Sequence, residues 1–123
     1  MTLSSTVTAF LVIAVLLVGY MAYLFWTDPE RGLRETTHRL EKLPYVLADR
    51  YTSFAVLGLG MILFGDYPII TVYFLAGAIM GLADGAIYAR AGYPHVKHTA
   101  SGVLSLLAMI VTAVAWATAG GGV

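Results

Sequence analysis

The chain has 123 residues, of which 59% are hydrophobic and only 11% are charged. Soluble domains usually carry about 25% charged residues, so this composition, with a mean hydropathy of +0.82, excludes catalysis by a soluble module. The net charge is zero and no basic patch is interleaved with aromatics, which argues against nucleic acid as a partner. Cysteine is absent, which excludes disulfides, thiolate metal sites and thiol nucleophiles.

Four apolar segments each approach the roughly 20 residues that cross a bilayer as a helix. The predicted spans are 7–26, 45–64, 69–90 and 98–118. Residues 1–6 lack Lys and Arg, and no Ala-x-Ala pattern follows the first segment, so an uncleaved helix is expected there. We therefore predict an all-α integral membrane protein, a single four-span domain over residues 1–123 that folds as an antiparallel up-down four-helix bundle.

Residues 28–44 form the one strongly polar stretch. Asp28 followed by Pro29 suits a helix start, because Asp caps helices and Pro is tolerated at the first helical position. Opposite charges then recur at i,i+4 spacing, in the pairs Glu30/Arg34, Arg31/Glu35 and Glu35/Arg39. The pattern favours an interfacial amphipathic helix, with Leu33, Leu40 and Leu43 on its apolar side. A mobile solvated loop is the alternative.

The second and third spans are joined by Gly65-Asp66-Tyr67-Pro68, which is typical of a tight turn and predicts a helical hairpin. All seven Lys and Arg residues then fall on one side of the membrane: Arg31, Arg34, Arg39, Lys42, Arg50, Arg90 and Lys97. The positive-inside rule makes that side cytoplasmic. Both termini are therefore expected on the non-cytoplasmic side, and the expected location is a bacterial inner membrane.

Asp84 is the most informative residue, because a carboxylate inside an apolar span costs several kcal/mol unless it is paired or faces a polar cavity. It lies six residues before Arg90, or roughly 9 Å from the boundary of the span. Arg50 lies five residues inside the second span, at about 7 to 8 Å. The two depths match, so Arg50 is the expected partner of Asp84.

The other spans bring polar groups to the same depth. Candidate catalytic residues are Asp84, Arg50 and His98, and candidate ligand-binding residues are Asp84, Arg50, Tyr88, Tyr23, Asp49 and Ser101. Glycines at i, i+4 and i+8, namely Gly77, Gly81 and Gly85, predict a face of the third span that packs closely on protein. On the fourth span, a small and polar stripe is predicted from His98, Ser101, Gly102, Ser105, Ala108 and Thr112. No cofactor or metal is expected, since His95 and His98 straddle a loop without a second His pair nearby.

Residues 49–105 resemble a known family. The features are Arg50 opening a span with Gly58-Leu-Gly60, Gly65-Asp66 before a new helix, Leu75-Ala-Gly77-Ala to Asp84-Gly-Ala, and His98 opening the last span. Together they resemble the small four-span membrane proteins grouped as domain of unknown function 4267, which look distantly akin to DoxX-type proteins. The resemblance implies a four-helix bundle with Arg50, Asp84 and His98 as notable positions, and it implies no particular chemistry.

Three functions remain open from the sequence. The first is a pocket for a small hydrophobic ligand near the cytoplasmic face, anchored by Asp84 and Arg50; an enzyme there would suit isomerisation or hydration of a lipid-like substrate. The second is a non-enzymatic scaffold or accessory subunit, with a structural Arg50/Asp84 ion pair. A small proton-coupled transporter is disfavoured, because multidrug-type exporters carry their carboxylate in a first span and this one has no acid. The expected partners are the lipid bilayer, the hydrophobic ligand, and a second copy of the chain or a larger membrane complex.

Overall fold

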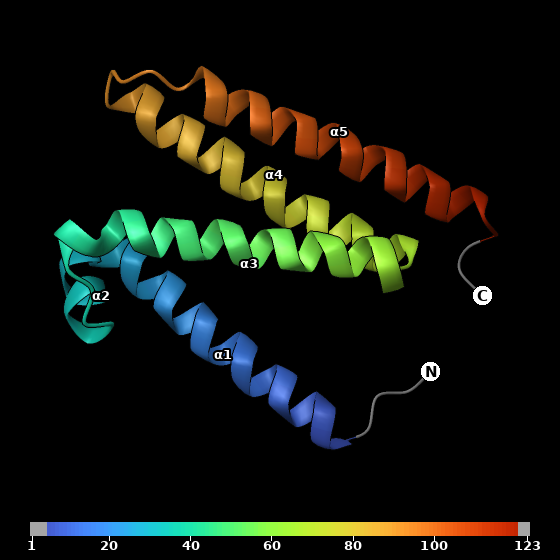
Figure 1. Ribbon diagram of the computed structural model, residues 1–123, viewed down its shortest axis with the longest axis horizontal. Helices are drawn as coiled ribbons and strands as arrows, with labels where there is room; N and C mark the ends of the chain where they lie inside the picture. Colours follow the sequence, from blue (N-terminus) through green and yellow to red (C-terminus); the bar gives the residue numbers. More distant parts are fainter. Residues whose placement is uncertain (1–4, 121–123) are drawn as a thin grey trace. The chain divides into compact units, whose positions relative to one another are not determined.

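The computed structural model describes residues 5–120, and all regular structure in that range is helical (Figure 1). Four helices are long and apolar enough to cross a membrane: α1 (Ser5–Thr27), α3 (Leu43–Phe64), α4 (Tyr67–Arg90) and α5 (Val96–Thr118). Between α1 and α3 lie the short helix α2 (Pro29–Glu35) and the 3-10 turn η1 (Leu40–Lys42). The predicted all-α class and four membrane-length helices are thus confirmed.

Each long helix begins two residues before the predicted span, whereas three of the four ends agree and α1 extends one residue further. For α4 the reason is that the helix starts at a polar cap and not at the first residue of the apolar run. Asp66 illustrates this, since its carboxylate accepts a hydrogen bond from the Ile69 amide at 3.2 Å and so caps α4, with Pro68 in the first turn. Asp66 was predicted only as a turn residue.

Apolar side chains point outward along the long helices. Within residues 5–120, the only buried apolar side chains are Leu24 and Ala78, each 2% exposed. Large residues such as Ile62 and Phe64 are more than four-fifths exposed, at 82% and 87%. Such exposure is untenable in water but ordinary where lipid tails cover the surface. Burial and helix length together identify an integral membrane protein.

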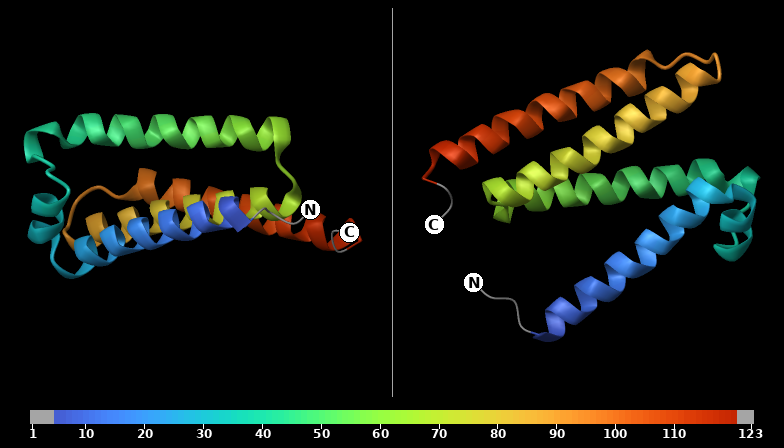
Figure 2. Two further views of the ribbon diagram at one scale, coloured as in Figure 1. Left: turned by 90° about the horizontal axis from the view of Figure 1, so that it is seen from below. Right: turned by 180° about the vertical axis from the view of Figure 1, so that it is seen from behind.

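The structure describes two compact units, the first ending at Arg50 and the second beginning at Tyr51. The first holds the corner between α1 and α2. The second holds the rest of α3 and the hairpin of α4 and α5, which run side by side in opposite directions (Figure 2, right).

The α4–α5 hairpin is closed by glycines. A Cβ placed on Gly81 would lie 2.5 Å from the main-chain nitrogen of Gly102, and one on Gly77 would lie 3.0 Å from the Ser105 hydroxyl oxygen. A Cβ on Gly85 would collide with the Thr99 side chain. The two main chains can therefore approach only because these positions carry no side chain, which confirms the prediction that the glycine face of this span packs on protein.

Hydroxyl groups supplement the packing in the second unit. The Thr71 hydroxyl of α4 donates to the Thr112 hydroxyl of α5 at 3.0 Å. The Tyr73 hydroxyl donates to the main-chain carbonyl of Phe54 in α3 at 3.1 Å. Gly58 makes room for this bond, since a Cβ there would lie 2.9 Å from the Tyr73 oxygen.

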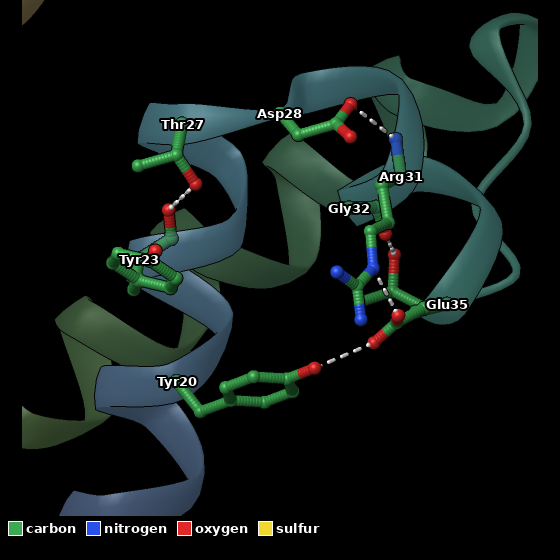
Figure 3. A network of polar contacts seen from close by, with 8 residues as sticks. Tyr20, Tyr23, Thr27, Asp28, Arg31, Gly32 and Glu35 are labelled. Carbon is green, nitrogen blue, oxygen red and sulfur yellow. Dashed lines mark hydrogen bonds and ion pairs between the residues drawn. The ribbon is translucent and has the colours of Figure 1, made fainter.

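The α1–α2 corner is held by polar side chains (Figure 3). The Asp28 carboxylate accepts the Arg31 amide at 3.0 Å and caps α2, as its position before Pro29 predicts. Glu35 then accepts two hydrogen bonds, from the Arg31 guanidinium at 2.6 Å and from the Tyr20 hydroxyl at 3.0 Å. The Arg31 guanidinium and the Tyr20 hydroxyl together lower the pKa of Glu35. The predicted Arg31/Glu35 pair is confirmed.

The predicted helix over 28–44 is wrong in its length. Helix α2 ends at Glu35, and Arg39 has an extended backbone with φ −113° and ψ 138°, so Glu35 and Arg39 do not share a helical face. The helix ends because Thr37 adopts a left-handed conformation with φ 56°, and its amide and that of His38 bond back to the carbonyls of Arg34 and Leu33.

Candidate functional site

The carboxylate of Asp84 lies against the first turns of α5. Asp84 neighbours Gly85, whose closeness to Thr99 brings this part of α4 against the start of α5. One carboxylate oxygen, Oδ2, lies 3.9 Å from Nδ1 of His98. This distance is within ion-pair range but longer than a hydrogen bond. The side chains of Asp84 and His98 are 30% and 37% exposed, so both remain accessible.

Tyr88 lies one helical turn beyond Asp84 and covers one face of the His98 ring. The two rings are stacked, with centroids 4.9 Å apart and planes 3° from parallel. Tyr93, from the loop after α4, meets Tyr88 edge-on at 6.3 Å. We call Asp84, Tyr88 and His98 the Asp84 cluster. Three of the residues selected from the sequence are thus brought together.

The sequence interpretation missed two neighbours of the cluster. Thr99 contacts Gly85, and its hydroxyl lies 3.1 Å from Nδ1 of His95. Tyr93 supports Tyr88. Thr99 was detectable, since Thr99, Gly102 and Ser105 recur every three residues opposite the glycines of α4. Ser101, predicted to lie on the same stripe, is exposed.

The remaining predicted site residues belong to the first unit. Arg50 is half-buried near the start of α3, and the adjacent Asp49 is exposed. Tyr23 is 63% exposed on α1, where its main-chain carbonyl accepts the Thr27 hydroxyl at 2.7 Å. The pairing of Arg50 with Asp84, and a role for Asp49 or Tyr23 beside it, stay predictions.

A hollow lies beside His98 at the beginning of α5. It has a volume of about 330 Å³ and is lined by Pro94, Val96, Lys97 and His98. We call it the His98 hollow. A larger apolar groove of about 510 Å³ lies at the other end of α4, between α3 and α4, where Gly58, Tyr73 and Phe74 contribute to its wall. Asp84 lines neither of them, so the cluster reaches a hollow only through His98.

Within residues 5–120, no three His, Asp or Glu side chains gather in a way that could hold a metal ion. The Asp84 cluster brings together a carboxylate, an imidazole and a phenol. A carboxylate facing one imidazole nitrogen orients the ring and leaves the other nitrogen to donate or accept a proton. Such a pair can hold a polar head group or move a proton.

Comparison with protein-family models, with characterised proteins and with solved structures finds no match to this chain. The class is therefore defined by the fold alone, as an all-α integral membrane protein with four candidate spans in residues 5–120. The resemblance to domain of unknown function 4267 stays a prediction.

Proposed function

We propose that this protein binds a small hydrophobic molecule through a polar site built on the Asp84 cluster. The observation that supports this most is the 3.9 Å contact between Asp84 and His98, with Tyr88 stacked on the imidazole. Ligand sites commonly combine apolar walls with a few convergent polar groups. Here the polar groups come from two helices whose other surfaces are apolar.

The cost of placing Asp84 in a membrane helix also favours a function. An ionisable group at such a position is expensive, and it persists where a partner or a polar cavity offsets the cost. His98 supplies one partner. Because both side chains stay about one-third exposed, neither is sealed off from a ligand.

The proposal includes an orientation and a second anchor. The side of the membrane with all seven basic residues is the cytoplasmic one, which suits a bacterial inner membrane and places both termini outside. Arg50, at a depth matching that of Asp84, is the proposed second anchor, with Asp49 and Tyr23 near it. If a reaction takes place, Asp84 and His98 move a proton while Arg50 stabilises negative charge.

The test is whether a hydrophobic molecule co-purifies with the protein and depends on the cluster. Wild type, Asp84→Asn and His98→Gln are purified in neutral detergent, and the organic extracts are compared by mass spectrometry. We expect a compound enriched with wild type and lost from both variants. Asp66→Asn is the matched control, because Asn also caps helices and Asp66 lies at the opposite end of α4. Equal retention in all four proteins would overturn the proposal.

A structural role is the alternative that the same contact supports, since an Asp84–His98 interaction also holds α4 to α5. In that case the protein is a scaffold or accessory subunit, and Asp84 with its proposed partner Arg50 fixes the bundle. Asp84→Asn would then lower the free energy of unfolding without changing the extract. Exchange of Arg50 and Asp84 would restore expression.

A further inference from the structure

His98 connects Asp84 to the His98 hollow. Its Nδ1 is turned to Asp84, and one face of its ring is covered by Tyr88. Within residues 5–120, no hydrogen bond reaches Nε2, which lies across the ring from Asp84. His98 also lines the hollow, so Nε2 and the uncovered ring face are what the imidazole offers to an occupant.

The electrostatic character of the hollow is positive. Lys97 contributes an ammonium group, and Pro94 and Val96 complete an apolar wall without any acid. The titratable groups around His98 are Asp84 and Tyr88 on α4, Tyr93 in the loop, and His95 and Lys97 beside it in sequence. Asp84 is the only acid among them, and it lies on the Nδ1 side of the ring.

We infer that the His98 hollow binds the acidic head group, carboxylate or phosphate, of an amphiphilic molecule. Lys97 supplies its positive charge and Nε2 of His98 donates a hydrogen bond. Asp84 is a positioning residue that acts through His98. The inference rests on the proposed function and names the ligand class of the same site.

The imidazole ring of His98 has two nitrogens and can therefore contact Asp84 and a head group at the same time. When both ring nitrogens carry protons, the ring is a cation with one N–H directed at Asp84 and the other available to the head group. The Asp84 carboxylate and the head group each stabilise the positive charge on the His98 ring, and each therefore favours binding of the other. The position also fits, since the hollow lies at the start of a membrane-length helix, where lipid head groups reside, and Val96 in its wall is 72% exposed.

The experiment uses electron paramagnetic resonance on the full-length protein in a neutral detergent. Three spin-labelled probes are compared: stearate, its uncharged methyl ester, and phosphatidylglycerol. We expect an immobilised signal from at least one anionic probe, with apparent affinity about 25-fold above that of the ester, the product of about fivefold from each of Lys97 and His98. Stearate alone would identify a free acid as the ligand, and phosphatidylglycerol alone would identify a lipid head group.

Variants then test the assigned roles. Lys97→Gln and His98→Gln should each lower the affinity for the anionic probe about fivefold. Lys42→Gln, which removes the same charge in the linker before α3, is the matched control and should change nothing. Asp84→Asn should also lower the affinity for the anionic probe, and it should add nothing in a His98→Gln background, as expected for a residue that acts through His98.

The outcomes separate this inference from the proposed function. If acid and ester are immobilised equally, and Asp84→Asn abolishes both signals while Lys97→Gln changes neither, the hydrophobic site stands and the acidic head group is wrong. If no probe is immobilised and no compound co-purifies with wild type, both proposals fail. An effect of Lys42→Gln equal to that of Lys97→Gln would show general charge attraction and overturn the assignment to the hollow.

Discussion

The α4–α5 hairpin and the α1–α2 corner both depend on glycine, but the partner of the glycine differs. In the hairpin, main chain meets main chain at Gly81 and Gly102. In the corner, a Cβ on Gly32 would lie 3.0 Å from the ring of Phe25, and the rest of the contact is made by ions and hydroxyls. The difference reflects what surrounds each region. Helices surrounded by lipid gain most from close backbone packing. A corner at the end of a span can instead use charged side chains that water solvates.

Adding one methyl group to the hairpin should have the largest effect on stability. Gly81→Ala places a Cβ 2.5 Å from the Gly102 nitrogen, so the main chains must separate, at a cost of roughly 1–3 kcal/mol. The chain has no cysteine, so Thr71→Cys with Thr112→Cys gives a clean disulfide reporter of hairpin closure. We expect Gly81→Ala to slow formation of the disulfide.

Gly60→Ala is the control for that substitution. Gly60 lies within the long helix α3 and a Cβ there meets nothing within 4 Å. Gly60→Ala should leave the rate of disulfide formation unchanged and should not lower the free energy of unfolding. Equal effects of the two substitutions would show that the approach of Gly81 to Gly102 is not what holds the hairpin.

The next largest effect is expected at the ends of two helices. Two residues after the end of α4 lies Gly92 at φ 75°, and two residues after the end of α2 lies Thr37 at φ 56°, with the same pattern of backbone bonds. A left-handed conformation costs a residue with a side chain roughly 1–2 kcal/mol. Thr37→Gly should therefore raise the free energy of unfolding by about 1 kcal/mol, and Gly92→Thr should lower it similarly. Thermal unfolding followed by circular dichroism measures both.

Gly92 allows a clear interpretation of this exchange, because a Cβ there meets nothing within 4 Å and only the backbone conformation is changed. If Thr37→Gly instead destabilises the protein, the Thr37 side chain makes a contact worth more than the strain it causes.

A smaller effect is expected from Gly32→Ala in the corner. The added Cβ meets the Phe25 ring, which can rotate away, whereas a main chain cannot. Ala also favours the helix over Gly by roughly 1 kcal/mol, which offsets the loss of ring packing. The free energy of unfolding should therefore change by less than half as much as in Gly81→Ala. If Gly32→Ala lowers the free energy of unfolding as much as Gly81→Ala does, the Phe25 ring cannot rotate away and the corner is packed as rigidly as the hairpin.

The sequence was sufficient for the four long helices and partly sufficient for the candidate site. Helix length and the glycine period of α4 are local properties, so hydropathy and spacing predicted them. The split of 28–44 was missed because Thr37 carries no sequence signal of a left-handed residue, for which Gly or Asn is usual. Asp84 and Tyr88 share a face by helical spacing, but their contact with His98 depends on how the loop 91–95 sets the register of α5, and spacing within one helix cannot give that.

The smallest effect concerns pH and the corner alone. Because hydrogen bonds from Arg31 and Tyr20 lower the pKa of Glu35 in the folded protein, the stabilisation is present above the unfolded pKa of about 4.3 and is lost as pH falls through the lower folded value. Spin labels on α1 and α2 should therefore report a constant distance at neutral pH and a broader distribution in strong acid. Glu35→Gln should show a broader distribution at every pH, and Glu30→Gln, on the same short helix, should behave as wild type. If the distance distribution of the wild type does not change with pH, the packing of Gly32 on Phe25 maintains the corner without its charges. The α1–α2 corner would then depend on packing against a glycine, as the α4–α5 hairpin does.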